Sequence, residues 1–342
     1  MIESRFTTLL ELWFNDHCRS LPWRGLKDPY LIWISEIILQ QTRIAQGMEY
    51  YQRFVERWPD VQSLAKAKED EVLKMWEGLG YYSRARNLHE AAKSMAEAGG
   101  FPHNYDEVRA LKGVGDYTAA AVCSMAYNLP YAALDGNAFR VLGRVFGIEE
   151  AADSATGKKV YKELASELLD KKRPGLFNQA MMDFGALQCI PKNPHCMECP
   201  LAAMCEARAQ GRVDLFPVKE KRPTIKERHF NYYWIEWRGK VLLRRREGKD
   251  IWRGLYEPFL CEENGDLPET FGGRSATCQM LKCNVKHVLT HRVIWANFFQ
   301  LRLPSEYIPH EIPEGYRFFS PKETEQMAFP ELVRKNMCIF EP

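Results

Sequence analysis

The stretch NYDEVRALKGVGDYTAAAVCSMAYNLPYAALDGN, residues 104–137, decides the fold around which the rest of this chain is organised. Asn104 followed by Glu107 is typical of a capping box, which predicts a short helix that runs to about Lys112. The Gly-Val-Gly sequence at residues 113–115 then predicts a tight turn with exposed backbone. Together these signals predict a helix-hairpin-helix, whose tip offers unshielded N–H groups to a phosphate oxygen.

The second helix of this hairpin is expected to start with Asp116 as its cap and to pack closely through the alanines that follow. An ordinary αα-hairpin is the alternative, because a Gly-x-Gly turn alone is weakly specific. Three features argue against an ordinary hairpin. They are the complete order Leu-x-Gly-Val-Gly-x-Tyr-Thr-Ala, Lys112 at the tip, and Asp135 within the letters LDGN.

The length and composition favour two globular domains. A chain of 342 residues is long enough for each of two domains to bury its own core. The hydrophobic fraction of 46% is that of a globular protein and excludes a disordered one. The formal net charge of +2 does not by itself indicate nucleic acid, but residues 219–253 carry twelve Lys or Arg against five Asp or Glu. This excess is compatible with a nearby phosphate backbone, and a solvated linker is the alternative.

The N-terminus and the cysteines predict the compartment. No apolar h-region follows Met1 and no long uncharged run occurs, so neither a signal peptide nor a membrane span is expected. Ten cysteines without a secretory signal indicate a reducing compartment, where clustered thiols hold metal more often than they form disulfides. A cytoplasmic protein is therefore expected.

A predicted helix over residues 30–45 carries the first candidate acid. The helix is apolar nearly all round, which is typical of burial, and its polar residues Glu36, Gln40 and Arg43 form one stripe. A solvent-facing stripe is the alternative. However, a carboxyl group with such apolar neighbours is a candidate for a raised pKa, and hence for an acid that is protonated near neutrality.

Four cysteines form the spacing C-x6-C-x2-C-x5-C at Cys189, Cys196, Cys199 and Cys205. Four thiolates within such a short segment can enclose one tetrahedral metal ion or one iron–sulfur cubane. Structural zinc sites usually combine two short-spaced pairs, and only one is present here, so a [4Fe–4S] cluster fits better although the spacing alone does not exclude zinc. A disulfide is a further alternative.

Strand-like alternation begins after a charged, proline-containing linker at residues 216–228. The pieces NYYWIEW, KVLLRR and HVLTHRVIWANFFQLRL predict strands, whereas residues 1–215 show only helical patterns. The chain is therefore expected to be multidomain, with an all-α domain at residues 1–215 and an α+β domain at residues 229–342.

These motifs together resemble the endonuclease III, or helix-hairpin-helix, superfamily of DNA glycosylases, and most closely its MutY-type adenine DNA glycosylases. The hairpin with its aspartate, the cysteine spacing, LPWR at residues 21–24 and SEIILQQTR at residues 35–43 carry the resemblance, which covers essentially the whole chain. It implies a helical catalytic domain with a [4Fe–4S] cluster loop and a Nudix-like domain that recognises 8-oxoguanine. It also implies a nucleoid-associated monomer that acts on double-stranded DNA.

The resemblance implies a repair enzyme that flips adenine out of an A·8-oxoguanine or A·G mispair and hydrolyses its N-glycosidic bond. Glu36 would protonate the adenine and Asp135 would stabilise the sugar cation, as paired carboxyl groups do in glycosidases. Asn137 would help to position them. Bifunctional relatives carry a Schiff-base lysine eighteen residues before the aspartate, and this position is Tyr117 here, so base removal without strand cleavage is expected.

The resemblance also implies which residues contact DNA. Arg24 and Gln179 would contact the flipped adenine, and Trp23 would line its pocket. The residues that would wedge into the duplex are Leu79, Tyr81 and Gln41, and Thr42 would contact DNA beside them. Lys112, Gly113 and Gly115 would hold a phosphate at the hairpin tip, whereas Thr290 and His291 would read the oxidised base.

Two departures and two alternatives accompany this interpretation. The reading loop, commonly Phe-Ser-His in the family, is Leu-Thr-His at residues 289–291, so Thr290 keeps the hydroxyl group. The sequence lacks a Nudix hydrolase box, which makes the C-terminal domain a reader and not a pyrophosphatase. The alternatives are a pyrimidine-specific glycosylase on the same fold and a non-catalytic DNA-binding module.

Overall fold

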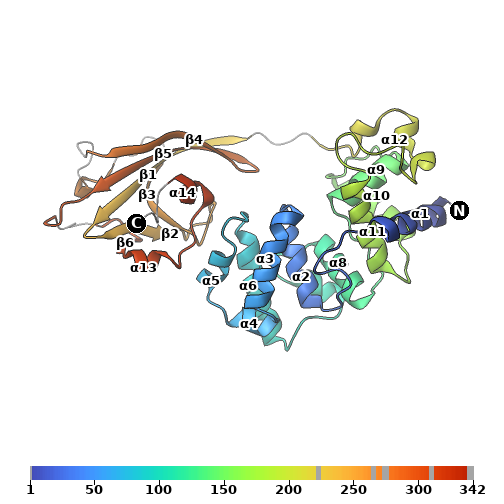
Figure 1. Cartoon of the computed structure of the whole chain (residues 1–342), viewed down its shortest axis with the longest axis horizontal. Helices are drawn as coiled ribbons and strands as arrows, with labels where there is room; N and C mark the ends of the chain where they lie inside the picture. Colours follow the sequence, from blue (N-terminus) through green and yellow to red (C-terminus); the bar gives the residue numbers. More distant parts are fainter. Residues whose placement is uncertain (1, 221–224, 263–266, 272–276, 308–311, 337–342) are drawn as a thin grey trace. The chain divides into compact units, whose positions relative to one another are not determined.

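The computed structural model describes residues 2–220, 225–262, 267–271, 277–307 and 312–336. The chain forms two compact units, one mainly helical and one built on a sheet (Figure 1). Unit 1 comprises Met1–Lys66 and Glu90–Lys221, and unit 2 comprises Ala67–His89 and Arg222–Pro342. Within the described ranges, no helix is long and apolar enough to cross a membrane.

Unit 1 contains helices joined by short connections. Its helices are α1 (Ile2–His17), α2 (Pro29–Leu39), α3 (Ile44–Arg57), α4 (Val61–Lys66), α7 (Tyr105–Ala110), α8 (Asp116–Tyr127), α9 (Gly136–Phe146), α10 (Ala155–Leu168), α11 (Pro174–Leu187), α12 (Glu206–Ala209), η1 (Ala202–Met204) and η2 (Val213–Leu215). Helix α5 (Glu69–Met75) lies in unit 2, and α6 (Ser83–Glu97) runs from unit 2 into unit 1. No strand occurs in the described residues 2–220, as the helical patterns predict.

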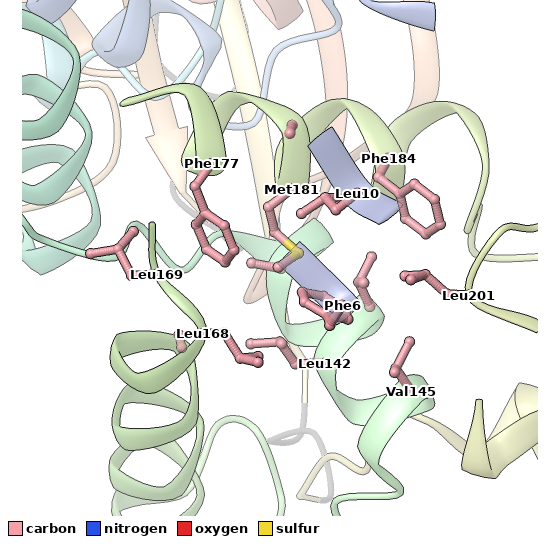
Figure 2. Close-up of a cluster of buried hydrophobic side chains, with 14 of the residues drawn as sticks. Phe6, Leu10, Leu142, Val145, Leu168, Leu169, Phe177, Met181, Phe184 and Leu201 are labelled. Carbon is pink, nitrogen blue, oxygen red and sulfur yellow. The ribbon is translucent and has the colours of Figure 1, made fainter. Parts of the chain in front are cut away.

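A hydrophobic core joins α1, α9, α10 and α11 (Figure 2). Phe6 and Leu10 are four residues apart on one face of α1, and they meet Leu142 from α9 and Phe177 and Phe184 from α11. Each of these five side chains is at most 1% exposed, and burying each one stabilises the fold by roughly 2–3 kcal/mol. This core fixes α9 and α11 against each other, and both helices carry candidate site residues.

Helix α2 ends earlier than the sequence pattern predicts. The side chain of Asp28 caps its N-terminus, and the last helical residue is Leu39. Gln41 has a φ of 59°, in the left-handed region that a right-handed helix cannot continue through. The predicted single helix over residues 30–45 is therefore wrong, and residues 40–43 form an irregular connection to α3.

The helix-hairpin-helix forms from α7 and α8, with one correction to the expected capping. The Asn104 side chain accepts a hydrogen bond from the Glu107 N–H at 3.0 Å, as a helix-starting cap does. The cap of α8 is Gly115, and Asp116 is instead the first residue of the helix. The Asp116 carboxylate is held by Arg109 from α7, which joins the two arms of the hairpin.

Unit 2 is built on one six-stranded sheet, as the alternating segments predict. The strands β1 (Lys226–Trp237), β2 (Lys240–Arg245), β3 (Tyr256–Glu262), β4 (Gln279–Val288), β5 (Arg292–Arg302) and β6 (Tyr316–Phe319) lie in the order β4-β5-β1-β3-β2-β6. Neighbours are antiparallel except β1 and β5, which are parallel. Along β1, Phe230, Tyr232 and Trp234 enter one core and Ile235 enters another, as the two-residue period of a strand requires. The described helical elements here are η3 (Glu269–Phe271), α13 (Pro321–Thr324) and α14 (Glu331–Asn336), besides α5 and the start of α6.

The segment Ala67–His89 packs within unit 2, whereas the sequence pattern grouped it with the helical domain. Arg245 Nη2 lies 2.6 Å from Glu69 Oε1 and 3.1 Å from Asp70 Oδ1. Glu77 Oε1 accepts a hydrogen bond from the Phe329 N–H at 2.9 Å. These contacts join residues far apart in sequence, so local periodicity carries no signal for them.

Candidate active site

A pocket of about 590 Å³ lies in unit 1 between α2, α8, α9 and α11. The break after α2 contributes residues 40–42 to its wall, and the segment before α2 contributes a basic and an aromatic side chain. Nine of the predicted site residues line this pocket: Trp23, Arg24, Glu36, Gln41, Thr42, Tyr117, Asp135, Asn137 and Gln179.

Glu36 is a buried acid at this pocket. It lies on α2, whose side chains are buried nearly all round, and is only 6% exposed. Burial raises the pKa of Glu36 to about 7, because the charged carboxylate loses its hydration. A hydrogen bond from Tyr117 lowers this pKa in part, while the nearby charge of Asp135 raises it. Folding therefore places a carboxyl group that is half protonated near neutral pH at the pocket.

Tyr117, on the first turn of α8, holds this acid. Its hydroxyl group donates to Glu36 Oε2 at 2.5 Å and lies 3.7 Å from Met182 Sδ. Burial and the two carboxyl groups near it, Glu36 and Asp135, raise the pKa of Tyr117 well above its ordinary value. The phenol therefore stays a neutral donor and fixes the direction of the Glu36 side chain.

Asp135 is the second carboxyl group of the pocket and caps α9. Asp135 Oδ1 accepts from the Ala138 N–H at 2.7 Å, and Oδ2 accepts from Asn137 Nδ2 at 2.7 Å. Burial raises the pKa of Asp135, and these two hydrogen bonds oppose the rise because they stabilise the ionised form. The two carboxyl groups thus have different surroundings, one bonded to a phenol and the other to amide donors and a helix N-terminus.

Arg140 connects this carboxylate to the cysteine loop. Its Nη2 donates to Asn137 Oδ1 at 2.7 Å and to the Gly185 carbonyl at 2.6 Å, and its Nε donates to the Cys189 carbonyl at 2.8 Å. A Cβ atom on Gly185 would lie 2.5 Å from the Asn137 Cβ, so α11 approaches α9 this closely only with glycine at that position. The Asn137 side chain is consequently held between Asp135 and Arg140.

Asp183 is a pocket residue that the sequence reasoning missed. It is 1% exposed, and its carboxylate is paired with Arg19 at 2.5 Å and with Arg24 at 2.7 Å. These bonds hold Arg24 at the wall of the pocket. The spacing could have revealed it, because Asp183 follows the predicted Gln179 by four residues and so shares its face of α11.

The four predicted cysteine ligands lie around one small enclosed cavity. Arg144 from α9, which is 2% exposed, holds their loop by donating to the carbonyl groups of Ile190 at 2.8 Å and Pro191 at 2.9 Å. In the described part of the chain, no three His, Cys, Asp or Glu side chains converge as they would around a single metal ion. Four thiols around one cavity are the ligand set of a [4Fe–4S] cluster.

The tip of the hairpin is exposed, as its predicted role requires. Lys112, Gly113 and Gly115 are all exposed, and Gly113 has a φ of 76°, where a side chain would be strained. The Val114 side chain points inward and is 4% exposed. The buried Val114 side chain therefore anchors the tip, while the backbone groups of the tip face outward.

The reading residues and two of the predicted wedge residues, Leu79 and Tyr81, belong to unit 2, whereas the third wedge residue, Gln41, lies in unit 1. Tyr81 is 49% exposed on a loop with a φ of 47°, whereas Leu79 is only 8% exposed. Thr290 and His291 are exposed at the tip of the turn between β4 and β5. The Tyr81 hydroxyl group lies 2.8 Å from Thr290 Oγ1, so these two predicted DNA contacts are hydrogen-bonded to each other.

Three family profiles match the chain. Residues 34–168 match the HhH-GPD superfamily of base excision DNA repair proteins, residues 189–205 match the iron-sulfur binding domain of endonuclease III, and residues 231–337 match the NUDIX domain. The second match covers the four cysteines of the predicted cluster, and their thiols are its candidate ligands. The chain therefore carries an iron–sulfur site within residues 189–205.

Relatives at the level of whole sequences are adenine DNA glycosylases. The protein of that name from Buchnera aphidicola subsp. Schizaphis graminum is 36% identical over 98% of this chain and 99% of its own length. The mouse protein of that name is 39% identical over 65% of this chain and 45% of its own length. Among solved structures, a thermostable thymine-DNA glycosylase aligns with 61% of this chain at a TM-score of 0.57 and 30% identity. An endonuclease III–DNA complex aligns with 60% at a TM-score of 0.53 and 22% identity, a likeness of fold alone.

Proposed function

This chain belongs to the adenine DNA glycosylase family, and from that membership we propose that it excises adenine paired with 8-oxoguanine or guanine and leaves an abasic site. Adenine-specific N-glycosylase activity in base excision repair follows from the family. The choice of mispair and the absence of strand cleavage are the proposal. The observation that carries it is the pair of carboxyl groups, Glu36 and Asp135, in one pocket, with the phenol of Tyr117 bonded to Glu36 where a lysine amine would be needed.

Glu36 protonates the leaving adenine in this proposal. A glycosidic bond to adenine breaks only when the base accepts a proton, and an acid with a pKa of about 7 is close to the ideal for proton transfer at neutral pH. The Tyr117 hydroxyl group orients the acid at 2.5 Å, while Arg24, held by Asp183, and Gln179 line the wall on which the flipped base would rest.

Asp135 stabilises the positive charge that develops on the sugar. Its carboxylate faces the pocket while accepting bonds from Ala138 N and Asn137 Nδ2, which hold it in place and favour its ionised form. Water then completes the hydrolysis. The [4Fe–4S] cluster, when bound, holds the Cys189–Cys205 loop in its fold and supplies no group to the reacting bond.

The absence of strand cleavage is proposed from Tyr117. Strand cleavage through a Schiff base needs an amine that attacks the sugar, and the side chain that approaches Glu36 from α8 is a phenol with a pKa far above its ordinary value. Borohydride should therefore trap little covalent DNA adduct at neutral pH.

Recognition of the mispair is assigned to both units. The hairpin tip at Lys112, Gly113 and Gly115 would hold a phosphate, Tyr81 and Gln41 would enter the duplex, and the tip at Thr290 and His291 would read the base opposite adenine. Leu79 would join them only after leaving its buried position, since it is 8% exposed in this structure. The pyrimidine-specific alternative is less supported, because the similarity to the thymine-DNA glycosylase covers only 61% of this chain, whereas the adenine DNA glycosylase of Buchnera aphidicola subsp. Schizaphis graminum matches 98% of it.

Glu36→Gln tests the catalytic assignment. Glutamine keeps the size of the side chain and removes the acid, so single-turnover release of adenine from an A·8-oxoguanine duplex should fall by at least about 10³-fold while duplex binding is kept. Glu11→Gln, at a buried carboxyl group that does not line the pocket, is the control and should release adenine at the wild-type rate. Equal inertness of wild type and Glu36→Gln would instead support a non-catalytic DNA-binding module.

A further inference from the structure

The turn between β4 and β5 is held at several points. The Leu289 N–H donates to the Arg292 carbonyl at 2.8 Å, which places Thr290 and His291 at the tip. The His291 carbonyl accepts from the Lys226 N–H on β1 at 3.3 Å. The Leu289 side chain packs on the hydrophobic core beneath the sheet. The tip is thus exposed, but both of its flanking residues are fixed.

Arg292, the last residue of this turn, is bound to a carboxylate from another part of the sheet. Its Nη1 donates to Asp250 Oδ1 at 2.6 Å. Asp250 lies in the connection between β2 and β3, more than forty positions earlier in the chain. The same carboxylate accepts from Arg228 Nη1 at 2.8 Å and from Arg246 Nη2 at 2.9 Å.

The other two arginines tie Asp250 to the rigid centre of the sheet. Arg228 from β1 also pairs with Glu262 on β3 at 2.7 Å. Arg246 also pairs with Glu257 on β3 at 2.6 Å, and Glu257 is fully buried. Burial by itself would raise the pKa of Asp250, but hydrogen bonds from Arg228, the Ile251 N–H and Arg292 lower it to about 2. The carboxylate is therefore charged throughout the pH range in which DNA is a stable duplex.

We propose that Asp250 and Arg292 are positioning residues that set the specificity of base reading, because their ion pair fixes the Thr290–His291 tip on the sheet. This inference rests on the proposed reading of 8-oxoguanine at that tip. Discrimination between two bases that differ by an oxygen and a proton depends on hydrogen bonds, which weaken with small errors in distance and angle. A tip that is free to move would bind both bases and distinguish them less.

A direct phosphate contact is the competing role for Arg292, whose side chain is 37% exposed. Phosphate contacts carry no information about bases, so losing one weakens binding to every duplex by the same factor. Asp250→Asn separates the two roles. It leaves the cation of Arg292 in place and frees it, so a phosphate role predicts equal or tighter binding, whereas a positioning role predicts lost discrimination.

The test measures dissociation constants of the full chain for A·8-oxoguanine and A·G duplexes, with Glu36→Gln as the background so that no base is released. Arg292→Met and Asp250→Asn should each reduce the preference for 8-oxoguanine by about tenfold or more. The double variant should lose no more than the larger single change, because the Arg292–Asp250 ion pair is already broken in each single variant. Arg292→Lys, which keeps the charge, should recover most of the preference.

Arg302→Met is the matched control. Arg302 lies at the opposite end of β5 and also pairs with a carboxylate, that of Glu236, at 3.0 Å. This variant should keep the preference of the parent protein. A general loss of folding would weaken both duplexes together and leave their ratio unchanged, so the ratio reports positioning and not stability.

The outcomes distinguish the proposed reading of 8-oxoguanine from the proposed role of the ion pair. A parent protein without preference for 8-oxoguanine overturns the proposed reading itself. A parent that has the preference, together with Arg292→Met and Asp250→Asn variants that retain it, overturns the ion-pair role alone. Equal weakening of both duplexes in Arg292→Met, with unchanged binding in Asp250→Asn, assigns Arg292 to phosphate and also overturns it. If Asp250→Asn does not fold, the comparison of Arg292→Met with Arg292→Lys decides.

Discussion

At the scale of single residues, the pocket contains a buried carboxyl group that is hydrogen-bonded to a phenol. Tyr117 donates a hydrogen bond to Glu36, and this bond lowers a pKa that burial raises to about 7. The acid is therefore protonated below about pH 7 and loses its proton above it. A group that must donate a proton is active only while it holds one.

The pH dependence of excision follows with a definite sign. The single-turnover rate should be constant at mildly acidic pH and should fall about tenfold per pH unit above about pH 7, as Glu36 ionises. Tyr117→Phe removes a hydrogen bond that favours the ionised form, so the midpoint should move to higher pH. Tyr127→Phe, whose hydroxyl group bonds the Pro102 carbonyl outside the pocket, should leave the midpoint in place. An unmoved or lower midpoint in Tyr117→Phe would contradict the assignment.

Sequence reasoning predicted nine of the residues that line the pocket but missed Asp183. Glu36 was predictable because an isolated carboxyl group among apolar residues is costly to bury without a use. Asp183 was missed because its partners Arg19 and Arg24 lie far away in sequence and meet it only after folding. Residue identity and local spacing therefore predict which chemical groups a site contains. They do not predict which of these groups pair with each other across the fold.

At the scale of elements, the close approach of α9 and α11 fixes the position of Asn137 beside the proposed catalytic carboxylate. Gly185 allows this approach, because a Cβ atom there would lie 2.5 Å from the Asn137 Cβ and 3.0 Å from its Cα. The Asn137 side chain in turn bonds Asp135 at 2.7 Å. A small side chain on α11 would therefore displace the carboxylate without touching it.

Gly185→Ala should slow adenine excision by about ten- to a hundredfold, since a misplacement of about 1 Å at reacting groups costs about this much. Binding to duplex DNA should change far less, because the hairpin tip is untouched. Gly248→Ala is the control, since a Cβ atom there meets nothing within 4 Å. A Gly185→Ala enzyme with wild-type turnover would show that the packing of α9 on α11 does not control the carboxylate.

Element boundaries were the least predictable part of the fold. The break at Gln41 follows a run of residues that all favour helix, and nothing in SEIILQQTR marks the left-handed backbone that ends α2. Similarly, aspartate is a common capping residue, but the Asp116 carboxylate forms an ion pair with Arg109, and Gly115 caps the helix instead. In both cases a tertiary contact or backbone constraint outweighs local propensity.

At the scale of the whole molecule, the cysteine loop at residues 189–205 is bound to the helices of unit 1. Arg144, buried on α9, holds this loop through the carbonyl groups of Ile190 and Pro191. A buried guanidinium group needs its partners, so the fold of the loop and the core beside it depend on each other.

The purified protein should be brown, with broad visible absorption and about four irons per chain. Cys199→Ala should lose this colour and weaken duplex binding by at least about tenfold, because the loop loses its cross-link. Cys18→Ala, at an exposed cysteine outside the loop, should keep both colour and binding. A colourless, zinc-loaded protein with full activity would contradict the cluster assignment.

The segment Ala67–His89 has a consequence for how the protein responds to proteolysis. Since it packs within unit 2 through contacts such as Arg245 with Glu69 and Glu77 with Phe329, the chain passes from one unit to the other three times. A single cut within residues 216–228 should therefore yield two fragments that co-elute under native conditions and separate only in denaturant. A chain that ends near residue 215 should expose the apolar face of this segment and aggregate. Sequence comparison consequently recognises two domains, but a single cleavage does not separate the two units physically.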